Sequence, residues 1–144
     1  MSEVDVENQP SVGLRQLLTG IAFSLLAVFA IAISLEPDGR GYGTHQQLGL
    51  PPCTFRELTG VNCPHCGMTT CFANFVRGNM SAAWQANPAG IPLVIMLMLA
   101  IPYCLSISVS GRWLGTNRPF FWFIVISLGY LTLSLLVWFF QLLT

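Results

Sequence analysis

The chain has 144 residues, of which 53% are hydrophobic and only 8% are charged. Soluble domains average about 25% charged residues, so this chain has too few ionised side chains to cover a water-facing surface, and it is too hydrophobic to be disordered. Its six basic residues, all arginine, are balanced by six acidic residues, which argues against a nucleic-acid partner because phosphate binding requires a basic surface. The composition predicts an integral membrane protein in contact with the lipid bilayer.

The first predicted membrane span covers residues 17–35, which include no charged residue. A helix of this length extends about 28 Å, close to the ~30 Å thickness of the hydrocarbon core. A cleavable signal peptide is the alternative, because small residues occur at cleavage-site spacing in positions 30–32. However, the N-terminal tail, residues 1–16, carries three acidic residues and only Arg15 as a base, whereas secretion signals begin with a positive region. We therefore predict a retained transmembrane helix.

Two further apolar segments, residues 91–109 and 119–143, are predicted as the second and third spans. Trp122 and Trp138 lie near opposite ends of the third span and fit the aromatic belts found at membrane surfaces. The predicted fold is therefore an all-α integral membrane protein with three transmembrane helices. A long extramembrane segment (36–90) connects the first two spans, and a short connection (110–118) joins the last two.

The distribution of arginines predicts the orientation in the membrane. Arg15, Arg112 and Arg118 lie in the short tail and the short connection, whereas the other three arginines are spread over the long segment 36–90. Long loops contribute little to the positive-inside rule. We therefore predict that the N-terminus and the connection lie in the cytoplasm and that segment 36–90 lies outside.

The long segment 36–90 is predicted to contain two helices after a stretch rich in glycine and proline. Residues 54–57, Thr-Phe-Arg-Glu, have the capping-box form with Thr54 as the N-cap, and Gly60 is a plausible helix stop. A second helix is predicted over residues 64–77, where apolar residues recur at helical spacing. We expect this amphipathic helix to lie along the membrane interface, with its phenylalanines toward lipid and Arg77 toward water.

Four of the five cysteines fall in this segment. Cys63 and Cys66 are predicted to share the first turn of helix 64–77, where the helix dipole stabilises a thiolate and lowers the thiol pKa. Cys53 is expected to lie nearby, because only a short helix separates it from them. Cys71 belongs to the apolar stripe of the helix and Cys104 lies within the second span, so both are predicted to be buried packing residues.

The cysteine pattern resembles a known family signature. Its residues are Cys53-x-Phe55-Arg56-x-x-Thr59-Gly60-x-x-Cys63-Pro64-x-Cys66-Gly67-Met68-Thr69. This pattern is similar to that of a bacterial membrane family known as domain of unknown function 2752, and Gly78, Ala83 and Asn87-Pro88 fit the segment that follows. The resemblance covers roughly residues 50–110, although Thr54 and Thr70 stand where the family usually has Pro and Arg. It implies a protein of the bacterial cytoplasmic membrane and brings no established activity.

The leading hypothesis for function is a membrane scaffold or accessory subunit. In this hypothesis the cysteines fasten segment 36–90 and the partners are other membrane proteins. No charged residue lies within a span, which argues against a transporter or proton path. The chain also has no motif typical of nucleotide binding or of hydrolases.

A second hypothesis is thiol–disulfide exchange. The tetrapeptide Cys63-Pro64-His65-Cys66 is similar to the active site of periplasmic thiol oxidases of the thioredoxin superfamily, but the chain has no βαβ pattern. A better analogy is the class of quinone-linked helical membrane proteins with a Cys-x-x-Cys pair near the lipid interface. Cys63 would then attack, Cys66 would resolve and Cys53 would relay electrons, with a quinone as the cofactor. A structural disulfide is the simpler alternative.

A third hypothesis is a metal site. Cys53, Cys63 and Cys66 offer three thiolates, and His65 is the proposed fourth ligand, with Cys71 and His45 as alternatives. Thiolate and imidazole ligands suit zinc or a softer metal. A zinc ribbon needs two Cys-x-x-Cys pairs, whereas this chain has one, so the sequence leaves the three hypotheses open.

Overall fold

The computed structural model describes residues 9–115 and 118–143, and within these ranges every regular element is a helix. Three helices are long and apolar enough to cross a membrane: α2 (Val12–Ser34), α6 (Gly90–Ser110) and α7 (Pro119–Leu143). Between α2 and α6 lie the 3-10 helix η1 (Thr44–Leu48), α3 (Thr54–Thr59), α4 (Met68–Phe75) and α5 (Met80–Ala86). The prediction of an all-α protein with three spans is confirmed. The acidic residues of the N-terminal tail and residues 116–117 of the connection lie outside the described residues.

The first span starts earlier than its hydropathy indicated. α2 begins at Val12 instead of residue 17, because the Ser11 hydroxyl caps the helix by accepting a hydrogen bond from the Leu14 N–H at 3.3 Å. The added turn contains Arg15, whose Nε donates to the carbonyl of Ser108 in α6 at 2.8 Å. A tertiary contact therefore accommodates the charge that marked the limit of the span in the sequence.

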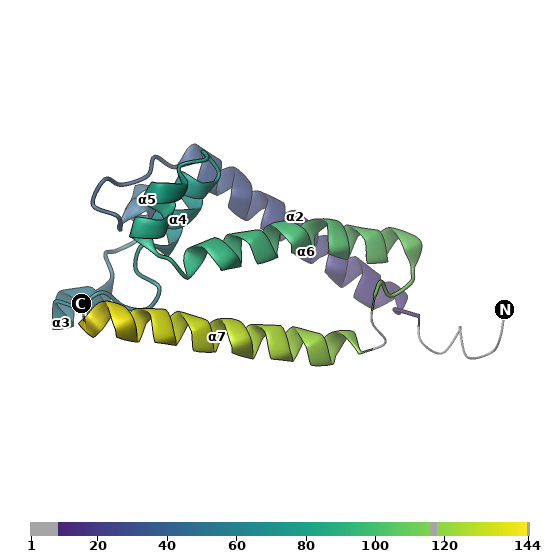
Figure 1. Cartoon of the computed structure of the whole chain (residues 1–144). Helices are drawn as coiled ribbons and strands as arrows, with labels where there is room; N and C mark the ends of the chain where they lie inside the picture. Colours follow the sequence, from purple (N-terminus) through teal and green to yellow (C-terminus); the bar gives the residue numbers. More distant parts are fainter. Residues whose placement is uncertain (1–8, 116–117, 144) are drawn as a thin grey trace.

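The helices α2 and α6 lie side by side and run in opposite directions (Figure 1). The side chains of Ala22 in α2 and Ile107 in α6 are both completely buried. Thr19 and Ser108 share a hydrogen bond between their hydroxyls. Small and hydroxyl-bearing residues are the usual contacts between membrane helices, so this pair forms the rigid base on which the shorter helices rest.

Helix α4 packs on one end of this pair. Phe72 stacks on Phe29 of α2 with ring centroids 6.2 Å apart, and the two rings contact a small core that contains Ala32 and Val94. We expected the phenylalanines of this helix to point toward lipid. Phe72 instead faces protein, because the ends of α2 and α6 together offer an apolar surface that neither offers alone.

Helix α4 is also shorter than predicted and does not contain Cys63 or Cys66. It covers Met68–Phe75 instead of 64–77, and its N-cap, Gly67, has a left-handed backbone with φ +79°. Residues 64–67 form a turn. Glycine adopts this conformation readily, so Gly67 interrupts the helical path that the apolar periodicity suggested.

Arg77 lies just after α4 and was predicted to point toward water. The residue is exposed, as predicted, and its side chain also reaches the C-terminal end of α2, where its Nη2 donates to the carbonyls of Ile33 and Leu35 at 2.8 and 2.7 Å. The last carbonyls of a helix have no partner within the helix, and a cation there also interacts favourably with the helix dipole. Arg77 therefore fastens α4 to α2.

The third span, α7, lies apart from the α2–α6 pair for most of its length, and its C-terminal end lies beside α3 (Figure 1). Trp138 makes the connection there. Its indole Nε1 donates to the carbonyl of Asn62 at 2.6 Å, and its ring meets Phe55 edge to face, with centroids 6.5 Å apart. Trp138, which was predicted to belong to an aromatic belt at the membrane surface, thus links the cysteine-containing loop to the third span.

Candidate functional site

The structure brings together three of the five cysteines. The Sγ atoms of Cys53, Cys63 and Cys66 all lie within 4.8 Å of one another, and those of Cys53 and Cys63 are 3.6 Å apart. All three side chains are partly buried. Cys71 and Cys104 are buried elsewhere, as predicted. The cluster therefore contains the cysteines that the sequence analysis singled out.

Cys53 is placed by helix α3. It is itself the N-cap, because the first helical residue is Thr54 and the Glu57 N–H donates to the Cys53 carbonyl at 3.0 Å. The capping-box prediction assigned this position to Thr54 and was off by one residue. The predicted stop is confirmed: Gly60 ends the helix in a left-handed conformation.

Cys63 and Cys66 are placed by a tight turn, closed by a hydrogen bond of 3.0 Å from the Cys66 N–H to the Cys63 carbonyl. Asn87, which follows α5, holds this turn from outside. Its side-chain amide donates to the carbonyls of Pro64 at 3.1 Å and Cys66 at 3.0 Å. In the sequence, Asn87 stood out only as part of the family pattern, because nothing local indicates a contact with a turn more than twenty residues earlier.

The variant Asn87→Asp should loosen the turn. Asn87 is almost completely buried, and a carboxylate in its place cannot donate to the two carbonyls, so we expect the free energy of unfolding to fall by about 2 kcal/mol. Chemical denaturation of the protein in detergent measures this loss, and thiol reagents should label Cys66 faster. Asn79→Asp is the matched control, because Asn79 is exposed and makes no side-chain capping bond. Equal losses in the two variants would contradict the role of Asn87.

The surroundings of the cluster shift the pKa values of Cys53 and Cys66 in opposite directions. The backbone N–H of Arg56 lowers the pKa of Cys53 by favouring its thiolate, and neighbouring cysteines add to this effect. Burial raises the pKa of Cys66 to about 11. The sequence analysis expected the helix dipole to lower it, but α4 begins only at Met68. Cys66 therefore lies outside the first turn, and desolvation dominates.

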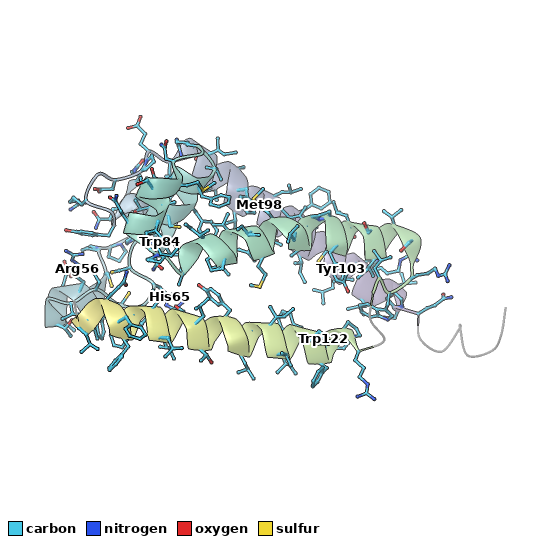
Figure 2. The ribbon with its side chains drawn as sticks, viewed as in Figure 1. Arg56, His65, Trp84, Met98, Tyr103 and Trp122 are labelled. Carbon is cyan, nitrogen blue, oxygen red and sulfur yellow. The ribbon has the colours of Figure 1, made fainter. Side chains whose placement is uncertain are left out.

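An open cavity of about 500 Å³ adjoins the three cysteines. It is also lined by His45 of η1, His65 of the turn and Arg56 of α3. Figure 2 shows Arg56 and His65 at the end of the molecule where α3 meets α7. The helix η1 is fixed on this side by a buried hydrogen bond of 2.8 Å between Thr44 and Thr70.

Neither histidine belongs to the cysteine cluster. Among the described residues, the group within 4.8 Å consists of the three cysteines alone, so the proposed fourth ligand His65 lines the cavity without joining them. His45 is held by a contact of 3.1 Å between its Nε2 and the Pro51 carbonyl. Because a carbonyl only accepts, Nε2 carries the proton and the lone pair of a neutral ring lies on Nδ1.

A cation lies beside the cluster. The guanidinium carbon of Arg56 is 3.4 Å from the centroid of the Tyr42 ring, and its Nη1 donates to the side-chain oxygen of Asn62. Arg40, which also lines the cavity, forms an ion pair with Asp38 at 2.6 Å. Stacking and hydrogen bonding fix the position of Arg56. The sequence analysis did not identify Tyr42, which lies in the irregular glycine-rich stretch.

The comparisons with known proteins give one match, to a family without an assigned function. No curated protein and no solved structure matches the chain. The segment that begins at Cys53 and runs into α6 contains the three clustered cysteines and Asn87. The model of a family described as "Protein of unknown function (DUF2752)" matches residues 53–101, which confirms the family resemblance indicated by the cysteine pattern.

Proposed function

We propose that Cys53, Cys63 and Cys66 form a metal centre at one end of a small three-span membrane protein. The observation that carries this proposal is the mutual approach of the three sulfur atoms within 4.8 Å. In a tetrahedral zinc site with Zn–S bonds of about 2.3 Å, ligand sulfurs lie about 3.8 Å apart. The 3.6 Å between Cys53 and Cys63 is close to this value, so small side-chain rotations would complete the set.

The ligand chemistry favours zinc or another thiophilic ion. Thiolates select soft and borderline metals, and each cysteine must lose its proton to bind. Since burial raises the pKa of Cys66 to about 11, metal binding at neutral pH would displace a proton from this thiol. The affinity for metal should therefore fall as the pH is lowered.

A bound metal would also hold segment 36–90 together, which is the role that the scaffold hypothesis gives to the cysteines. It would link α3 to the turn that precedes α4. Arg56 lies next to the cluster and would offset the negative charge of three thiolates on a divalent ion. The metal centre and the scaffold are thus compatible parts of one proposal.

Replacing any clustered cysteine by serine should abolish tight metal binding. We expect the purified full chain in detergent to bind one zinc ion and each of Cys53→Ser, Cys63→Ser and Cys66→Ser to lose affinity by about 100-fold, because each thiolate supplies roughly 3 kcal/mol of binding free energy. Competition with a chromophoric chelator measures the affinity, and elemental analysis measures the stoichiometry.

Cys71→Ala and Cys104→Ala are the matched controls for this experiment. Both thiols are buried and lie outside the cluster, so their removal should leave the metal affinity unchanged. Absence of stoichiometric metal from the wild-type protein, or an equal loss of affinity in the Cys71→Ala variant, would refute the metal centre.

A second candidate function is thiol–disulfide exchange, favoured by the contact of Cys53 with Cys63 and by the lowered pKa of Cys53. The Cys53 thiolate would attack a partner disulfide and release one partner thiolate. Cys63, after losing its proton to water, would then attack Cys53 Sγ and release the second. Two electrons pass to the partner and a Cys53–Cys63 disulfide remains. Here the attacking residue is Cys53, whereas the sequence favoured Cys63. Mixed disulfides trapped in Cys63→Ser but absent from Cys53→Ser would support this function.

We further propose that the cysteine cluster faces outward and that the N-terminal end of α2 faces the cytoplasm. Arg15 and Arg112 lie at the end where α2 begins and α6 ends, opposite the cluster (Figure 1), and short arginine-bearing segments stay inside. A membrane-impermeant thiol reagent on intact cells should label Cys53. Labelling only after lysis would place the cluster inside, where reducing conditions favour metal over disulfide chemistry.

A further inference from the structure

The three-cysteine cluster leaves one ligand position of a tetrahedral metal without a protein group. Structural zinc sites are closed by four protein ligands, whereas sites that exchange ligands keep three and leave the fourth position open. Among the described residues, no histidine or carboxylate joins the three cysteines within 4.8 Å. The composition of the cluster is therefore that of an open site.

The open side adjoins a space that a small molecule can enter. The cavity of about 500 Å³ is lined by all three cysteines, and this volume lies within the roughly 300–1,000 Å³ range of small-molecule sites. A ligand seated there would reach the metal directly. Gly43, Gln46 and Thr69 also line the cavity, together with the larger side chains of Tyr42 and Met68.

The charged groups of the lining suggest which ligand fits. Arg40 is neutralised by its ion pair with Asp38, and Glu57 contributes a carboxylate. Arg56 is different: within the described part of the chain, only its Nη1 has a hydrogen-bond partner, Asn62. Its Nε and Nη2 donors therefore remain free for a ligand. A guanidinium binds a carboxylate through paired hydrogen bonds, and a thiophilic metal prefers sulfur as its fourth ligand.

We propose that the metal centre binds a small thiol that carries a carboxylate, with the thiolate on the open metal position and the carboxylate on Arg56. This inference rests on the proposed metal centre and adds its exchangeable ligand. On binding, the thiol loses its proton to water and forms a metal–sulfur bond in place of a coordinated water. No electron is transferred in this step.

Cobalt(II) bound to the full chain in detergent tests the metal centre and its exchangeable ligand separately. Sulfur-to-cobalt charge-transfer bands report the three cysteine bonds, and the ligand-field bands report the fourth ligand. Mercaptoacetate is the probe, and 2-mercaptoethanol and acetate are its thiol-only and carboxylate-only counterparts. We expect mercaptoacetate to shift the ligand-field bands and to bind about tenfold more tightly than 2-mercaptoethanol, because one charge-assisted contact is worth 1.5 kcal/mol or more.

Variants of Arg56 test the carboxylate contact. Arg56→Gln should remove the preference for mercaptoacetate, while Arg56→Lys should keep part of it because the positive charge remains. Unchanged charge-transfer bands in both variants would show that the cysteine cluster is still formed. Arg112→Gln is the matched control, since Arg112 is exposed at the opposite end of α6, and should retain the full preference.

The possible outcomes separate the two proposals. If cobalt gives no charge-transfer bands, the metal centre fails and the ligand proposal fails with it. If these bands form but none of the three probes changes the ligand-field bands, the metal centre stands and the open position is refuted. If both thiols bind equally well, or if Arg56→Gln keeps the preference for mercaptoacetate, the carboxylate contact is refuted.

Discussion

Replacing Gly67 with alanine should destroy the cysteine cluster. A Cβ at this position would lie 2.2 Å from the Ala86 carbonyl oxygen and 2.6 Å from that of Gly41, and both obstacles are backbone atoms that cannot rotate away. The left-handed conformation of Gly67, with φ +79°, adds a further cost of about 1 kcal/mol for a residue with a Cβ. We expect the free energy of unfolding to fall by about 3 kcal/mol or more.

The effect on the site follows from the position of Gly67 directly after Cys66. A turn displaced from Ala86 also loses the hydrogen bonds from Asn87 to the carbonyls of Pro64 and Cys66. We expect the affinity for zinc to fall by about 100-fold, which corresponds to a strain of about 2.8 kcal/mol at the site. Chelator competition measures the affinity, and chemical denaturation in detergent measures the stability.

Gly78→Ala is the matched control for Gly67→Ala. Gly78 has nearly the same backbone conformation, with φ +77°, but nothing lies within 4 Å of the position of its Cβ. This variant should lose only the conformational contribution of about 1 kcal/mol and keep its metal affinity. If both variants lost the same stability, the close approach of Gly67 to Gly41 and Ala86 would not be what requires glycine.

The second large effect is expected for Arg77→Met. Arg77 donates four hydrogen bonds to backbone carbonyls, three of them at the end of α2 and one, at 2.7 Å, to Ala73 in α4. Methionine keeps much of the apolar stem but no donor, so these carbonyls lose a charged partner. Since hydrogen bonds to charged groups contribute about 1.5–3 kcal/mol each and are not additive, we expect a loss of about 3–4 kcal/mol in the free energy of unfolding.

Chemical denaturation in detergent measures the loss in Arg77→Met, and two further variants define its cause. Arg77→Lys should recover only part of the stability, because one ammonium group cannot reach carbonyls on two helices at once. Arg112→Met removes an exposed arginine and should change the stability by less than about 0.5 kcal/mol. A lysine variant as stable as the wild type would show that charge alone, and not the fork of donors, joins α4 to α2.

The membrane spans and the identity of the clustered cysteines were predictable from the sequence. A bilayer requires every backbone polar group to be bonded within its own segment, so a long apolar run has one stable conformation whatever surrounds it. This is why α6 and α7 occur where hydropathy indicated. The short spacing of Cys63 and Cys66, and the short helix between them and Cys53, likewise bring these residues close through local chain geometry.

The start of α4 and the raised pKa of Cys66 could not be predicted from the local sequence. Apolar periodicity records which residues avoid water, and it continues through Gly67 although the helix does not. The helix starts at Met68 because Gly67 lies against the backbone of Gly41 and Ala86. The same packing buries Cys66 and raises its pKa, whereas the local argument from a helix dipole gave the opposite direction.

The few charged residues of this chain show the same difference between what local sequence predicts and what tertiary packing decides. By itself the sequence determined that the protein is a three-span membrane protein with four of its five cysteines in the segment between the first two spans, because hydropathy and chain connectivity are local properties. Only the tertiary structure decided what the arginines do. Arg77 binds carbonyls of α2 more than forty residues away, and Arg56 stacks on Tyr42 beside the cluster. Neither arginine has its partners beside it in the sequence, so it is the packing of the fold that brings them together.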